Sequence, residues 1–148
     1  MGDGPMPIEP GERLDYLLSC KSLQLATLHP DGSPHLATMW FGVLGGDIVM
    51  WTRRTSVKAR NLRHDPRVAC LVESGRDYRS LKGLSVTGRA ELVEDDERML
   101  LIGEAIVPRN FSGPDRPDHR EMALSGARVG IIVHAERWAS WDFARTAG

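Results

Sequence analysis

The stretch DIVMWTRRTSVKARNLRHDPRVACLVE, residues 47–73, decides the fold that we expect for this chain. It reads as a strand, a basic turn, a short helix capped by Ser56, and a second strand. The turn places Arg53, Arg54 and Lys58 around the helix start, where backbone N–H groups are unpaired and the helix dipole is positive. A helix start with added cations is a good site for a phosphate or a carboxylate. The stretch therefore predicts a phosphorylated ligand held on an antiparallel β scaffold.

Length and composition are those of an ordinary globular protein. The chain has 148 residues, of which 41% are hydrophobic and 26% charged. These values predict one domain over residues 1–148, with a core that needs no metal or disulfide. Residues 1–10, rich in Pro and Gly, are expected to be disordered. The net charge of −1 argues against general affinity for nucleic acids.

Cysteine usage and hydropathy indicate a cytoplasmic protein. Cys20 and Cys70 are expected to be reduced, and Cys70 lies in an apolar run. No run approaches the ~18 apolar residues of a membrane span. The N-terminal segment lacks the basic and apolar regions of a secretion signal. We therefore expect a cytoplasmic protein that has no membrane partner.

Turn signals divide the chain into short strands. HPDGSP at residues 29–34 and Gly45-Gly46 are typical of hairpin turns. The strands that they join would form an antiparallel meander, and Gly88 indicates a bulge in a later strand. The pattern predicts a small sandwich or barrel. About six strands are expected, over residues 23–28, 35–43, 47–54, 68–73, 84–94 and 128–138. Short helices are expected over residues 12–18, 56–63, 95–107 and 119–124.

Motifs for chemistry carried by the protein itself are missing. The sequence has no GxGxxG, no GxxxxGK[ST] and no GxSxG. Its five histidines show no metal-binding spacing, and His35 and His134 are more typical of structural histidines than of bases. No catalytic residue or metal ligand is assigned. If the protein is an enzyme, the chemistry belongs to a bound cofactor.

Several segments resemble, in the same order, those of the FMN-binding split-barrel superfamily, also called pyridoxamine 5′-phosphate oxidase-like. The most specific is VKARNLRHDPRVACLV at 57–72, which is similar to the family's K-x-x-N-L-x-x-D-P-R-V segment. LATLHPDGSPHLATMWF at 25–41 resembles the opening hairpin, LSVTGRAELVEDD at 84–96 a later strand, and RWASWDF at 137–143 the aromatic last strand. Within the superfamily, the chain is most similar to the small flavin- or deazaflavin-dependent oxidoreductases of actinobacteria.

The resemblance implies a mainly β fold, a six-stranded antiparallel split β-barrel of Greek-key topology. It also implies a homodimer with two cofactor sites at its interface, for FMN or the deazaflavin coenzyme F420. The ring would lie against one strand, the ribityl phosphate would be bound by a second strand and the helix turn, and the other protomer would lend further groups. The candidate cofactor-binding residues are Thr38, Met39, Trp40, Phe41, Met50, Trp51, Thr52, Arg53, Ser56, Val57, Lys58, Tyr78, Arg79 and Lys82. The residues that the other protomer would lend are Tyr78, Arg79, Trp138 or Trp141.

Some of these assignments have structural alternatives. The alternative to a phosphate-binding role for Lys58 is that of an ordinary solvated lysine on the helix. Arg53 and Arg54 alternate on a strand, so only one of them faces the site, and Arg53 is preferred. Trp51, like the two later tryptophans, would also suit an oligomer interface. The chain lacks the substrate-binding extension of true pyridoxamine phosphate oxidases, so oxidation of vitamin B6 is not expected.

The function expected from these features is hydride transfer between a flavin or deazaflavin and a small conjugated substrate. The longer acidic tail of the deazaflavin needs more cations, which Arg79 and Lys82 would supply. The composition and the resemblance to small reductases tilt the choice towards coenzyme F420. An FMN-binding flavoprotein is the nearest alternative. A non-catalytic module that binds flavin or haem is a second alternative, and a structural dimer without a cofactor is a third.

Overall fold

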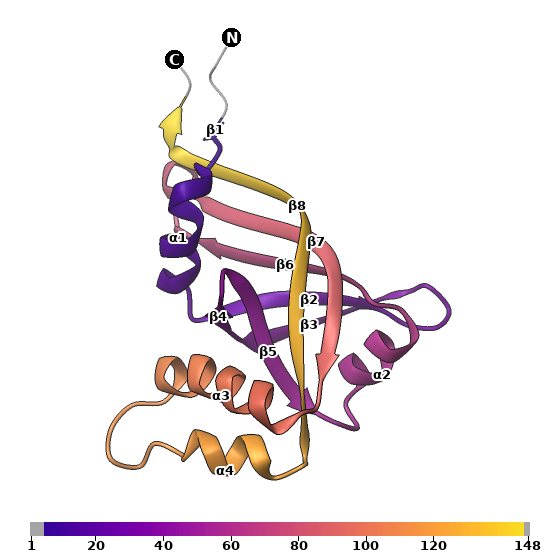
Figure 1. The fold of residues 1–148 in the computed structure, drawn as a ribbon. Coiled ribbons are helices and arrows are strands. Elements are labelled where there is room, and N and C mark those ends of the chain that lie inside the picture. The colour runs from indigo at the N-terminus through magenta and orange to yellow at the C-terminus, as the bar shows by residue number, and fades with distance from the viewer. Residues whose placement is uncertain (1–4, 147–148) are drawn as a thin grey trace.

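The computed structural model describes residues 5–146, which form a curled antiparallel β-sheet with short helices packed around it (Figure 1). The strands follow the order β3-β2-β6-β7-β8-β5-β4, and β1 pairs with β8 outside this path. Their bounds are β1 Pro5–Met6, β2 Ser22–Leu28, β3 Pro34–Trp40, β4 Gly42–Leu44, β5 Asp47–Arg53, β6 Arg67–Ser74, β7 Lys82–Val93 and β8 Arg128–Thr146. Since β1 and β4 are short pieces, the six longer strands carry the expected split barrel.

Helices pack around the sheet. In Figure 1, α3 and α4 lie together below the sheet, α1 lies beside its upper part, and α2 lies at the opposite side from α1. Their bounds are α1 Arg13–Ser19, α2 Val57–His64, α3 Asp96–Asn110 and α4 His119–Leu124, with the 3-10 turns η1 Pro10–Glu12 and η2 Tyr78–Ser80. Within residues 5–146, no helix has the length and apolar character needed to cross a membrane.

Both predicted hairpin turns are confirmed. β2 and β3 pair as far as Leu28 and Pro34, around a turn in which Gly32 has a φ of 85°. β4 and β5 are joined by Gly45 and Gly46 alone, with φ values of 58° and 87°. Positive φ at both central positions is the requirement of a type I′ turn, and glycine meets it without strain.

The expected meander of three strands is wrong, because the strand predicted over residues 35–43 breaks at Phe41. β3 pairs with β2, whereas β4 turns away to pair with β5 at the other end of the sheet order. A Cβ on Gly42 would lie 2.6 Å from the carbonyl oxygen of Ala105 in α3, so only glycine allows this close passage. Since β3 and β4 are consecutive in the chain and terminal in the sheet, the sheet curls into a barrel that stays split between them.

The core has two parts, one on each side of β5. The barrel interior contains Leu25, Phe41, Met50 and Ile131, all fully buried. A second cluster packs α3 and α4 against the outer face of the sheet, and its buried members are Val49, Val93, Met99, Ile102, Ile106 and Ala123. Alternating side chains of β5 therefore pack into both clusters, Met50 into the barrel interior and Val49 into the second cluster. Removal of this apolar surface from water is the main favourable term in folding.

The sheet also shows a bulge and an ordered N-terminal segment. The β7–β8 register shifts between Thr87 and Gly88, as expected for a bulge at this glycine. Residues 5–10, which we expected to be disordered, instead contain β1 and the start of η1, and the backbone N–H of Ile8 donates to Ser140 Oγ at 2.7 Å. Residues 1–4, the rest of the segment that we expected to be disordered, lie outside the residues that the structure describes.

Candidate functional site

A cavity of about 420 Å³ opens at the split of the barrel. One wall is the end of β3, and another is the end of β5, beyond its pairing with β4. α3, α4 and the start of β8, which gather at the base of Figure 1, close the remaining sides. This volume lies within the roughly 300–1,000 Å³ of small-molecule sites. The cavity is lined by Thr38, Met39, Trp40, Trp51, Thr52, Arg53, Ile106, Val107, Phe111, Met122 and Arg128.

The cavity brings together predicted residues from both strands. Thr38, Met39 and Trp40 come from β3, and Trp51, Thr52 and Arg53 come from β5. β3 is terminal in the sheet order and β5 is next to the other end, so their side chains meet here only because the sheet curls. Their assignment to a cofactor stays a prediction, and the geometry that it requires is present.

Arg53, rather than Arg54, lines this cavity. Arg54 forms an ion pair with Glu94, and its Nε donates to the carbonyl oxygen of Gly126 at 3.0 Å. Its role is therefore to hold the end of β5 against Glu94 and Gly126 of the same protomer. Arg53 alternates to the other side and lies exposed at the cavity.

Phe41 and Met50, also predicted to bind the cofactor, do not reach the cavity. Both side chains are fully buried in the barrel interior. Phe41 occupies the corner between β3 and β4, where Arg109 braces it. Arg109 Nε donates to the Phe41 carbonyl oxygen at 3.1 Å, and burial lowers the pKa of this guanidinium below its usual value. Both are core residues behind the site. Phe41 turns inward at the corner, and Met50 faces the barrel interior through the alternation of side chains along β5.

The turn before α2 is built as the sequence predicts. Ser56 caps the helix, since its Oγ accepts the backbone N–H of Ala59 at 3.1 Å. Thr52 Oγ1, at the cavity wall, donates to the same Oγ at 3.1 Å. Val57 and Lys58 form the first turn of α2 and are half-buried; neither belongs to the lining residues. The helix start therefore lies next to the cavity and is linked to it through Thr52.

Tyr78, Arg79 and Lys82 lie far from the cavity of their own protomer. Lys82 starts β7 and pairs with Asp142 near the far end of β8, whereas the cavity lies where β8 begins. Lys82 Nζ is 3.8 Å from Asp142 Oδ2. The Tyr78 ring packs on Phe143, with ring centroids 4.8 Å apart. None of the three residues lines the cavity of its own protomer, and their assignment to a cofactor stays a prediction.

Trp138 and Trp141 also lie away from the cavity. The Arg13 guanidinium stacks on Trp138, with its Cζ 5.0 Å from the ring centroid. Trp141 packs against the backbone of Gly83, where a Cβ would overlap its ring. Both tryptophans are accounted for by packing within one protomer.

Five cavity residues were missed by the sequence interpretation. Ile106, Val107 and Phe111 come from the end of α3, Met122 from α4 and Arg128 from the first position of β8. Phe111 meets Trp40 edge to face, with ring centroids 5.2 Å apart. Nothing local in the sequence marks them, because their place depends on how α3 folds back under β5.

Arg128 is the most informative of the missed residues. It lies directly opposite Arg53 in the β5–β8 register, and its guanidinium stacks on Trp51, with Cζ 5.4 Å from the ring centroid. None of the residues that line the cavity is acidic. The cavity thus combines two guanidinium groups with aromatic rings, which suits a planar anion.

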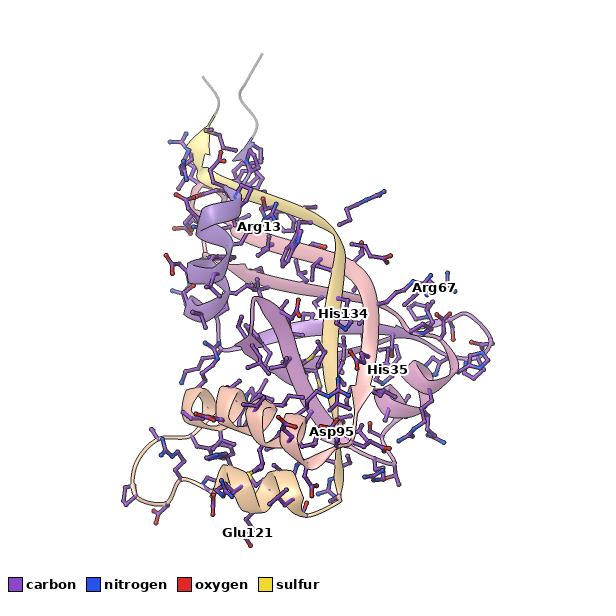
Figure 2. All side chains as sticks on the ribbon, in the orientation of Figure 1. Arg13, His35, Arg67, Asp95, Glu121 and His134 are labelled. Atoms are coloured by element: carbon purple, nitrogen blue, oxygen red, sulfur yellow. The ribbon has the colours of Figure 1, made fainter. Side chains whose placement is uncertain are left out.

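Histidine and cysteine side chains supply no reactive group to this cavity. His134 Nε2 lies 2.9 Å from Glu91 Oε1, in a surface cluster, and His35 meets His29 edge to face at 5.5 Å (His134 and His35 are labelled in Figure 2). Burial raises the pKa of the Cys70 thiol to about 12, so it stays protonated in the core. Within residues 5–146, no three His, Cys, Asp or Glu side chains are grouped to hold a metal ion.

A second cavity, of about 300 Å³, lies over β2, β6 and β7. Its lining includes Leu28, Pro34 and Val68, and its charged members are Arg67 and Glu136. Arg67 is already bound to Asp65, with Nη2 2.7 Å from Oδ2. No predicted site residue lines it, so the cavity at the split is the candidate site.

Comparisons with known proteins agree with this architecture. The family model described as pyridoxamine 5′-phosphate oxidase matches residues 10–142. The conserved hypothetical protein Rv2991 from Mycobacterium tuberculosis is 39% identical, with a TM-score of 0.83 over 93% of this chain and 86% of that chain. An F420 reductase is 26% identical, with a TM-score of 0.63 over 88% of this chain and 97% of that one.

Other comparisons are more distant. A heme binding protein from Mycobacterium smegmatis is 20% identical, with a TM-score of 0.71 over 95% of this chain and 57% of that chain, and shares the fold. No curated protein matches the chain significantly. With a family match over nearly its whole length and a split barrel of the expected kind, the chain belongs to the pyridoxamine 5′-phosphate oxidase family.

Proposed function

We propose that this chain is a flavin- or deazaflavin-dependent oxidoreductase that transfers a hydride to or from a small conjugated substrate. One observation carries the proposal, the cavity at the split of the barrel. It joins aromatic side chains to Arg53 and Arg128 and contains no acidic group. A planar, phosphorylated ring system satisfies both features at once. The likeness to an F420 reductase supports the choice of chemistry.

The residues around the cavity fit such a cofactor. Trp40 and Phe111 form an aromatic wall against which a flat ring can pack. Arg53 and the capped start of α2, with Lys58 in its first turn, offer charge and backbone N–H groups to a phosphate. When bound, a flavin or deazaflavin ring supplies the hydride chemistry.

The protein's own contribution is to bind and orient. The part of the cavity that one protomer forms has no His, Cys, Asp, Glu or Lys among its lining residues. Catalysis would therefore come from holding two reactants in line, which can lower a barrier by several kcal/mol, up to about 7–11. Trp51 and Met39 fix the floor of the cavity, because α3 and the barrel core pack behind them.

We further propose that the active form is a homodimer, assembled through the outer face of β3. Leu36 and Trp40 are 69% and 49% exposed, and alternation places them on the same face. Small residues continue this face, since Leu36 pairs with Ala26 and Ala26 with Ala69. Trp40 also lines the cavity, so a second copy seated here would reach the site. Such a copy would also allow Tyr78, Arg79 and Lys82, which do not line the cavity of their own protomer, to contribute to the site.

The experiment is a binding titration of FMN and coenzyme F420 side by side, followed by fluorescence, on the wild type and a Lys58→Ala variant. We expect the wild type to bind at least one of them, and the variant to bind it tenfold or more weakly, which is about 1.4 kcal/mol. Arg120→Gln, an exposed change on α4 outside the cavity, is the control and should bind as the wild type does.

Two outcomes would contradict the proposal. If the wild type binds neither cofactor, the proposed function is wrong. If Lys58→Ala binds as tightly as the wild type, the assignment of the phosphate to the start of α2 is wrong. If a cofactor binds, a second assay follows oxidation of its reduced form with conjugated enones and quinones. Binding without turnover would favour a non-catalytic carrier of the same ring.

A further inference from the structure

Two arginines face each other across β5 and β8 without a counter-charge. Arg53 and Arg128 are direct register partners, and cross-strand partners lie on the same face of a sheet. Like charges in this position destabilise a strand pair. Within residues 5–146, neither side chain forms an ion pair, although other arginines nearby do. Arg54 pairs with Glu94, and Arg98 pairs with Glu91 at 2.6 Å.

Arg128 is held in place before any ligand arrives. Its guanidinium stacks on Trp51, and its Nη1 lies 3.5 Å from the carbonyl oxygen of Met122. Trp51 is itself fixed, because its ring fits against Gly103 of α3, where a Cβ would be only 3.0 Å from the ring. A guanidinium has five N–H donors in a planar fork, so most of them stay available to the cavity.

The basic groups in and beside the cavity come from different elements. Lys58 lies at the start of α2 with the Ser56 cap, to which the first phosphate is assigned. Arg128 lies at the first position of β8, opposite Arg53 at the end of β5. One phosphate at α2 leaves Arg128 without a partner. A ligand that satisfies both groups needs a further acidic group.

We infer that Arg128, together with Arg53, binds a second acidic group of the ligand and thereby determines which cofactor the cavity prefers. This inference rests on the proposed function. The ligand class is a planar phosphorylated heterocycle that carries an additional carboxylate or phosphate, which coenzyme F420 has in its acidic tail and FMN lacks. Guanidinium groups suit both acids, since they bind either in a bidentate way.

The test compares the affinity of each cofactor for the wild type, Arg128→Gln and Arg53→Gln by calorimetry, with Arg120→Gln as the matched control. In Arg128→Gln we expect binding of coenzyme F420 to weaken tenfold or more and binding of FMN to change less than twofold. In Arg53→Gln both should weaken. Equal losses for the two cofactors in Arg128→Gln, or no loss for either, would overturn the inference.

A separate arm distinguishes failure of the inference from failure of the proposed function. If the wild type binds neither cofactor, inorganic pyrophosphate becomes the probe, with tryptophan fluorescence as readout because Arg128 stacks on Trp51. Saturable quenching in the wild type that is lost in Arg128→Gln would retain the two-arginine anion site without a flavin. Quenching that is equal in both proteins, or absent from the wild type, would remove it.

Discussion

At the scale of single residues, Asn61 shows what the most specific segment of the sequence does. Its Nδ2 donates to Thr27 Oγ1 at 3.0 Å, and the two side chains are only 3% and 1% exposed. This bond ties α2 to β2 and so fixes the helix whose start lies beside the cavity. When a buried donor loses its acceptor, the free energy that it cost to remove the donor from water is no longer offset by a hydrogen bond.

We predict that Thr27→Val lowers the free energy of unfolding by about 1–3 kcal/mol, because the Asn61 amide then stays buried without its acceptor. Urea denaturation followed by circular dichroism measures the loss. Asn61→Leu should cost a similar amount. The double variant should lose clearly less than the sum of the two, since no orphaned partner remains. Strictly additive losses would show that the two side chains act independently.

Asp65 and Arg67 in the same segment have a structural role that was not predicted. Arg67 donates to the Asp65 carboxylate from both its backbone and its guanidinium, and these hydrogen bonds lower the pKa of Asp65 to about 2. The sequence motif thus combines one candidate phosphate-binding residue, Lys58, with residues that position the helix. Residue types alone do not separate these roles, because both depend on which way a side chain points.

At the scale of elements, the corner between β3 and β4 is where the sequence interpretation failed. Residues 35–43 read as one strand because they are mostly apolar and contain no turn signal, whereas the chain bends at Phe41. The bend is imposed from elsewhere, since α3 passes over Gly42 and Arg109 holds the Phe41 carbonyl. By contrast, the turns and helix caps were predictable, because their causes lie within a few residues.

We predict that Gly42→Ala destabilises the fold by about 1–3 kcal/mol, because the new methyl group would lie 2.6 Å from a backbone oxygen of α3. Gly11→Ala is the control, since nothing lies within 4 Å of its added Cβ. Thermal unfolding of both variants measures the difference. A Gly42→Ala variant as stable as the control would mean that α3 can move away at no cost.

At the scale of the whole molecule, the fold class was predictable and half of the site was not. Alternation and turn spacing gave the strands, and the resemblance gave the barrel. The pairing of β5 with β8 joins segments that lie far apart in the sequence, and no local pattern specifies that register. Arg128 was missed for this reason, and the same pairing brings it opposite Arg53.

The proposed assembly gives a prediction at this scale. Leu36→Arg, which places a charge on the outer face of β3, should convert a dimer into a monomer and lower cofactor affinity at the same time. Leu124→Arg, an exposed leucine on α4, is the control and should leave the mass unchanged. Light scattering after size exclusion measures both. A wild type that is monomeric at micromolar concentration would contradict the assembly.

The central place of β8 in the sheet has a consequence for synthesis on the ribosome. This strand lies between β7 and β5 and also pairs with β1, yet it is the last of them to be translated. Until it leaves the exit tunnel, β5 has only the short β4 as a neighbour, and the edge of β7 is open. Unpaired edges and exposed apolar surface favour association between nascent chains. The barrel therefore cannot close before β8 has been synthesised, and until then the open edges of β5 and β7 are the places where nascent chains would associate.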